Sequence, residues 1–193
     1  MYHEGNRDLQ DQFGSRRLAD LLEEKLRRDR FNEADAVFIG AQTFFFLATA
    51  DADGRPDCSF KGGAPGFVRV AAPDLLVFPD FDGNGMFKSL GNLKVNPQVG
   101  LLFLSFGEKP ARMRVNGTAQ IGYEDDPLLA GMPGAQLVVR VTPVDIFPNC
   151  PRYIPNLAAV EASPYTPHEG VEPLEPKWKS FGDFADVAPP RRR

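Results

Sequence analysis

Short apolar runs separated by turn residues dominate the middle of the chain. Phenylalanine accounts for 16 of the 193 residues, and many of these lie in the apolar runs. Bulky side chains in runs of this length favour β-strands. The pattern predicts six or seven antiparallel strands, with helices in front of them and one helix inserted between strands. Because a closed sheet has no free edges, we expect these strands to form a barrel.

The first two predicted strands form a hairpin. Residues 43–50 (TFFFLATA) are almost all apolar, which predicts a strand buried on both faces. Asp53-Gly54 is a strong signal for a hairpin turn. In the second strand, residues 56–62, alternation places the side chains of Asp57, Ser59 and Lys61 together on one face.

The remaining elements follow the same logic. A helix is expected over residues 86–95, ended by Asn96-Pro97. Pro143 interrupts the last strand and indicates a sheet edge or a bulge. The other strands are expected at residues 67–71, 75–78, 98–106, 111–121 and 136–147.

The two ends of the chain differ from this core. Residues 1–14 are polar and are expected to be loose. Residues 15–29 have helical periodicity, with four leucines on one face, and we expect this face to pack on the barrel rather than on a partner. A second short helix would be capped by Asn32 and ended by Gly40. Beyond residue 155, recurring prolines predict an extended arm, anchored by Trp178, and a disordered end. The expected units are therefore residues 1–30, 31–154 and 155–193.

Charge and composition exclude several classes of protein. The formal net charge of −4 argues against nucleic-acid binding. The sequence has no leader-like start and no apolar stretch long enough to span a membrane. With only two cysteines, we expect free thiols and a cytoplasmic protein. The two histidines lie in the end segments, so neither a metal site nor a Ser/His/Asp triad is expected.

Two features could bind a phosphate group. The face formed by Asp57, Ser59 and Lys61 presents a hydroxyl and an ammonium group side by side. The loop Gly83-Asn84-Gly85 leads into a helix start that carries Lys88 and Ser89, where free N–H groups favour an anion. Spacing alone does not show that these two features converge on one pocket.

Four segments resemble the pyridoxamine 5′-phosphate oxidase-like FMN-binding family. They are FFFLATADADGRPDCSFKGG, LLVFPDFDGN, FKSLGNLKVNPQVGLLFLSF and ARMRVNGTAQI, in that family's order. The later NCPRYI (149–154) resembles the branch described as predicted flavin-nucleotide-binding proteins. The resemblance covers residues 31–154. It implies a mainly β fold, a six-stranded antiparallel split β-barrel with flanking helices, and a homodimer with two FMN sites between its subunits.

The resemblance also implies roles for individual residues. The second strand would run beside the flavin toward its phosphate, and Lys88 and Ser89 match an Arg-Lys pair that grips the phosphate. Serine at the second position removes one charge from that site. Arg112 matches a polar residue that reaches the cofactor across the dimer. The implied cofactor-binding residues are Asp57, Cys58, Ser59, Lys61, Phe78, Pro79, Asn84, Lys88, Ser89, Arg112 and Arg114.

Flavin chemistry needs little acid–base machinery from the protein, because the cofactor carries the reaction. An arginine near N1 of the flavin would favour its reduction, and the candidates are Arg112, Arg114 and Arg152. For Arg152 a surface ion pair is an equally good interpretation. Cys150 is expected to be a buried, inert thiol. The expected function is an FMN-dependent oxidoreductase of unknown substrate. The alternatives are a non-catalytic flavin carrier or sensor, or the same barrel binding deazaflavin F420 or haem.

The sequence also argues against pyridoxamine phosphate oxidation itself. True oxidases of the family hold the vitamin phosphate with the strand-two lysine and with Tyr, Arg and Ser on a helix after the sixth strand. The matching interval, EDDPLLAGMPGAQ (124–136), has none of these three residue types. Its two prolines and two glycines disfavour a regular helix, and its three acids would repel a phosphate dianion. We therefore predict a different substrate.

Overall fold

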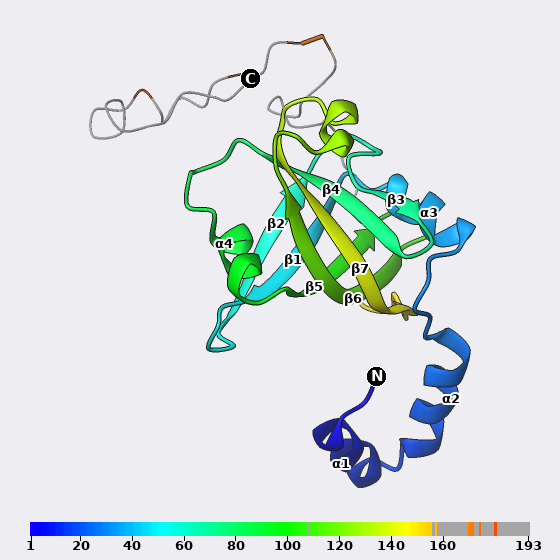
Figure 1. The fold of residues 1–193 in the computed structure, drawn as a ribbon. Helices are drawn as coiled ribbons and strands as arrows, with labels where there is room; N and C mark the ends of the chain where they lie inside the picture. The colour runs from blue at the N-terminus through cyan, green and yellow to red at the C-terminus, as the bar shows by residue number, and fades with distance from the viewer. Residues whose placement is uncertain (108, 156, 158–169, 172–173, 175–179, 181–193) are drawn as a thin grey trace.

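The computed structural model describes residues 1–107, 109–155, 157, 170–171, 174 and 180 (Figure 1). The predicted arm over residues 155–193, with its anchor Trp178, therefore lies almost entirely outside the described residues. No described helix is both long enough and apolar enough to cross a membrane.

Seven strands, all paired antiparallel, form one curled sheet in the order β2-β1-β5-β6-β7-β4-β3 (Figure 1). The expected mainly β fold is confirmed, but the sheet has seven strands rather than the six that the resemblance implied. The short strand β3, which was expected at residues 67–71, pairs only with β4 at one end of the sheet. The strands are β1 (Phe44–Ala50), β2 (Pro56–Gly62), β3 (Arg69–Ala72), β4 (Leu75–Phe81), β5 (Gln98–Ser105), β6 (Ala111–Gly122) and β7 (Ala135–Asn149).

The concave face of the sheet holds the main core. Phe45, Phe78 and Phe103 are fully buried there, with ring centroids 5.0–5.2 Å apart around Phe45. In β1, burial alternates, so the prediction that this strand is buried on both faces was wrong. Alternation places Phe44 and Phe46 on its outer face, which no helix covers in the described part of the chain.

The last strand, β7, lies inside the sheet between β6 and β4. Pro143 therefore marks a bulge and not an edge: the register with β6 shifts between Asn116 and Gly117, opposite the proline. A side chain at Gly117 would meet the carbonyl oxygen of Thr142 at 2.1 Å. Glycine permits the close approach that the bulge requires.

Two short helices border the sheet: α3 lies against β3, and α4 lies against β1 and β2. Helix α3 (Glu33–Gly40) has the predicted Asn32 cap, in a reciprocal capping box with Asp35. Gly40 is the last residue of this helix, as predicted, and Ala41 is its C-cap. Helix α4 (Lys88–Val95) starts later than expected, and Asn96 ends it as predicted. The interval after β6 contains only the 3₁₀ turn η1 (Pro127–Gly131), in agreement with the prediction of no regular helix.

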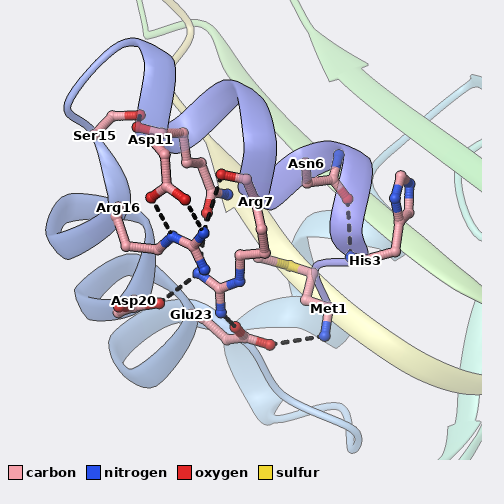
Figure 2. Close-up of polar contacts among 10 residues, drawn as sticks. Met1, His3, Asn6, Arg7, Asp11, Ser15, Arg16, Asp20 and Glu23 are labelled. Atoms are coloured by element: carbon pink, nitrogen blue, oxygen red, sulfur yellow. Dashed lines mark hydrogen bonds and ion pairs between the residues drawn. The ribbon is translucent and has the colours of Figure 1, made fainter.

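The N-terminal residues form a helical hairpin, α1 (Glu4–Gln12) and α2 (Arg16–Leu26), which lies apart from α3 and α4 (Figure 1). The expectation of a loose segment over residues 1–14 was wrong. Polar contacts join the two helices (Figure 2): Arg7 pairs with Asp20 at 2.5 Å and with Glu23 at 3.6 Å, and Arg16 pairs with Asp11.

The apolar face of α2 was expected to pack on the barrel, but it does not. Leu18, Leu21 and Leu22 remain 57%, 50% and 41% exposed. Helical periodicity identified the shared face correctly but not what lies against it. The hairpin is tied to β7 just after α2, by the Arg27–Asp145 ion pair and a backbone bridge between Arg28 and Ile146.

Candidate functional site

The polar face of β2 is confirmed by its pattern of burial. Asp57, Ser59 and Lys61 are half-buried, whereas Cys58 and Phe60 between them are exposed on the other face. The half-buried face is the one that continues into the core, because Ser59 pairs in register with Leu47 and Lys61 with Phe45, both fully buried. Cys58 is therefore separated from the three polar residues by the sheet itself.

The start of α4 lies against this polar face. Ser89 Oγ donates a hydrogen bond to Ser59 Oγ at 2.9 Å, so the two features that spacing could not connect are in contact. Lys88 is the first residue of the helix and is exposed. Phe87 before it has a left-handed backbone (φ 48°) and provides no side-chain cap, so the first N–H groups of α4 are free to bind an anion.

Two further hydrogen bonds hold α4 in place. Asn92 Nδ2 donates to Thr49 Oγ1 at 3.0 Å, and both residues are buried. Asn96 Nδ2 donates to the backbone oxygen of Asp51 at 3.3 Å. These contacts fix the helix against β1, so the position of Ser89 at its first turn is set by several bonds rather than by one. A pre-positioned anion site loses less conformational entropy on binding.

Lys61, the third polar residue on the β2 face, is paired with Asp80 of β4, a residue that was not expected at the site. Its Nζ lies 3.3 Å from Oδ1 of Asp80 in β4. The side chains are 19% and 11% exposed. Burial raises the pKa of Asp80, and the nearby Lys61 ammonium partly offsets this effect. The signal for Asp80 was present in the sequence, since it is the one charged residue in the apolar strand LLVFPDF.

The other residues expected near the flavin have different environments. Asn84 is exposed, and its Oδ1 accepts a hydrogen bond from the backbone N–H of Met86 at 3.0 Å, which shapes the loop before α4. Phe78 is fully buried in the core, so its side chain offers no surface to a ligand in this chain. Pro79, its neighbour, is buried against the opposite face of β4.

The two arginines of β6 lie on the outer face of the sheet. Register pairing places Phe60, Phe46, Leu102, Arg114 and Phe147 in one row across five strands. Arg112 shares this face, two residues before Arg114. The arginines are thus separated by the sheet from Ser59, Lys61 and Ser89. Among the described residues, the buried Nε of Arg112 and the buried Oδ1 of Asn149 opposite it have no hydrogen-bond partner.

The segment after β7 is exposed. Arg152 is exposed in a turn. Cys150 is also exposed, so the expectation of a buried cysteine there was wrong. Both cysteines are free thiols in the structure, as expected. The turn at Pro151 keeps Cys150 outside the sheet, because the pairing of β7 with β6 ends at Asn149.

Comparison with known proteins identifies the family. The family model described as pyridoxamine 5′-phosphate oxidase matches residues 31–164, which is more than half of the chain. The chain belongs to this family, and the resemblance seen in its sequence is confirmed. No curated protein sequence is similar enough to this chain to be identified as a relative.

Several solved structures are similar to part of the chain. HupZ of Group A Streptococcus is 21% identical, with 61% of this chain and 93% of that chain covered and a TM-score of 0.49. HutZ of Vibrio cholerae, described as a heme storage protein, is 18% identical, with coverage of 60% and 91% and a TM-score of 0.42. An FMN-binding protein of Syntrophomonas wolfei is 15% identical, with coverage of 72% and 96% and a TM-score of 0.44.

Proposed function

We propose that this chain binds FMN, one molecule per subunit, and uses it as an oxidoreductase on a small-molecule substrate. The observation that carries the proposal is the contact between Ser59 and Ser89, which joins the polar face of β2 to the free N-terminus of α4. Phosphate groups bind at such helix starts because the N–H groups and the helix dipole both favour negative charge.

The residues present fit a phosphomonoester. Lys88 supplies an exposed ammonium group, and Ser59 and Ser89 supply hydroxyl groups beside the free N–H groups of α4. Lys61 contributes less net charge than the sequence indicated, because Asp80 already balances it. Lys88 is therefore the main positive charge available to the phosphate, and Lys61 and Asp80 together form a polar wall beside it.

When bound, FMN would supply two-electron chemistry, and the protein would supply orientation and electrostatics. The β2 face would hold the phosphate end. Arginine side chains placed near the flavin ring would favour the reduced, negatively charged form. The candidates remain Arg112, Arg114 and Arg152, none of which forms an ion pair with a described residue.

A homodimer is part of this proposal. Arg112 and the phosphate-binding residues lie on opposite faces of one sheet, so a single FMN can touch both sets only if they come from two chains. The outer face carries exposed aromatic surface suited to such contact: Phe60 is 63% exposed and its ring stacks on Phe44 at 5.4 Å. The unpaired Nε of Arg112 on that face could be satisfied by the partner's bound cofactor.

The test is a titration of the purified full chain with FMN. We expect saturable binding, an oxidised-flavin absorption spectrum, and an increase of roughly 2.7 kcal/mol in stability at 100 times the dissociation constant. A spectrum of deazaflavin or haem, with no binding of FMN, would contradict the proposal. Turnover of reduced flavin with an electron acceptor, measured on the loaded protein, separates an oxidoreductase from a carrier or sensor.

A further inference from the structure

A pocket of about 260 Å³ lies on the outer face of β4, on the side opposite Lys61 and Asp80. Register pairing places Arg69 of β3, Val77 of β4 and Arg140 of β7 in one row on this face. η1 and the residues after it cover the row. The pocket is lined by residues 64–67 and Arg69, by Pro79 and Phe81 of β4, and by residues 131–133.

Apart from Arg69, the residues that line the pocket have apolar side chains or none. Met132 forms the inner wall and is 6% exposed, packed with the fully buried Val77 and Val138. On the opposite side, the ring of Phe67 stacks on Phe45 with centroids 5.9 Å apart. This ring also fills the space where a side chain at Gly63 would lie, because a Cβ there would meet its Cγ at 2.4 Å. The aromatic wall is therefore held by the core behind it.

The one charged group in the lining is Arg69. Its Nη1 lies 3.5 Å from the backbone oxygen of Gly131, which holds the guanidinium at the pocket mouth. Arg69 has no carboxylate partner in the described part of the chain, whereas Arg140 in the same row is bound by both oxygens of Asp126. The pocket thus combines apolar walls with one uncompensated positive charge.

We propose that this pocket binds a small, largely apolar carboxylate, with the apolar body against Phe67 and Met132 and the carboxylate on Arg69. Guanidinium groups bind carboxylates through paired, charge-assisted hydrogen bonds. The volume lies just below the range of about 300–1,000 Å³ typical of drug-sized ligands, so a single-ring acid suits it. The pocket is distinct from the proposed phosphate site, because Asp80 and its partner Lys61 lie on the other face of β4; of the residues that the resemblance implies for FMN, Pro79 lines the pocket.

The experiment measures benzoate binding to the full chain by isothermal titration or by ligand-observed NMR, without FMN and with it. We expect saturable binding of benzoate and at least tenfold weaker binding of benzamide, which has the same shape without the charge. Arg69→Gln should weaken benzoate about tenfold or more, in keeping with the loss of a charge-assisted hydrogen bond. Arg17→Gln, an exposed arginine on α2 without a described ion pair, is the matched control and should bind benzoate as the unmodified chain does.

A second variant keeps the test independent of the arginine. Gly131 has an ordinary negative φ, and a Cβ there would lie 3.5 Å from the guanidinium of Arg69, so Gly131→Leu is tolerated by the backbone and fills the mouth. It should abolish benzoate binding. The proposal is overturned if the unmodified chain binds no benzoate up to roughly 10 mM, or if Arg69→Gln and Gly131→Leu both bind it normally. FMN binding is measured in a separate titration, so an absence of benzoate binding would not contradict the proposed function.

Discussion

The ammonium group of Lys61 and the carboxylate of Asp80 face each other at 3.3 Å, and both side chains are largely buried. Lys61 comes from β2 and Asp80 from β4, which lie near opposite ends of the order of strands in the sheet. The ion pair therefore joins the two sides of the curled sheet beside the proposed phosphate site. Asp80 consequently affects both the stability of the fold and the charge available to a ligand.

The first prediction concerns the pH dependence of stability. Burial raises the pKa of Asp80 above that of the unfolded chain, so the folded state holds this proton more tightly. The contribution of Asp80 to stability is therefore fully present below the usual carboxyl pKa of about 4, and it is lost as the pH rises from there through the raised pKa. Asp80→Asn should remove this decline, so its stability relative to the original chain should increase between about pH 4 and pH 7. Urea unfolding at several pH values measures the difference.

Two variants sharpen this test. Lys61→Met removes the ammonium that lowers the pKa of Asp80, so the decline should extend to higher pH. Asp74→Asn removes an exposed carboxylate from the turn before β4 and should leave the pH profile close to that of the original chain. A constant difference between Asp80→Asn and the original chain across this pH range would show that Asp80 titrates alike in both states.

The second prediction separates the phosphate from the flavin ring. Lys88→Ala should weaken FMN by roughly tenfold or more, because charge-assisted hydrogen bonds contribute about 1.5–3 kcal/mol. It should leave riboflavin, which lacks the phosphate, nearly unchanged. Lys94→Ala, at the other end of α4, is the matched control. We expect the same direction for Lys61→Ala, with an added loss of stability because Asp80 is left buried without its partner. Equal losses for FMN and riboflavin in Lys88→Ala would place Lys88 away from the phosphate.

The sequence predicted most of the strands because local signals define them. Residues 56–62 were predicted as a strand and form β2 with the same bounds, since the Asp53-Gly54 turn and the polar alternation both act over a few residues. The end of α4 at Asn96 was also predicted, because Asn96-Pro97 is a local signal that ends a helix. Alternation also predicted which residues of β2 and β6 share a face. These features depend on the backbone and on nearest neighbours, which a single sequence contains.

The contacts between distant segments could not be predicted in this way. Nothing near Ser59 in the sequence indicates that it meets Ser89, 30 residues away, or that Asp80 pairs with Lys61. Helical periodicity grouped the leucines of α2 correctly, yet it carries no information on what covers them.

The third prediction tests the homodimer. Phe60→Glu places a charge at the exposed end of the aromatic row on the outer face, where an interface would bury it without a partner. Light scattering should show a dimer for the original chain at micromolar concentration and a shift toward monomer for this variant. Val37 on α3 is also apolar and is 68% exposed, so the control variant Val37→Glu should remain dimeric.

FMN affinity should fall together with dimerisation if both chains contact the cofactor. A monomer that binds FMN fully would rule out the shared site.

The last prediction is that the chain does not oxidise pyridoxamine 5′-phosphate, although it belongs to the family of that name. The structure refines the reason. Asp126 was expected to repel an anion. It does not, because Arg140 binds both of its oxygens and lowers its pKa. What remains unfavourable is geometry: the interval forms the turn η1, and the two arginines that reach it, Arg69 from β3 and Arg140 from β7, lie on the face opposite Lys61. A phosphate held by Lys61 therefore cannot also reach Arg69 within one chain. Incubation of FMN-loaded protein with pyridoxamine 5′-phosphate and oxygen should yield no pyridoxal 5′-phosphate at enzymatic rates. Turnover of about 1 per second or faster would overturn this prediction.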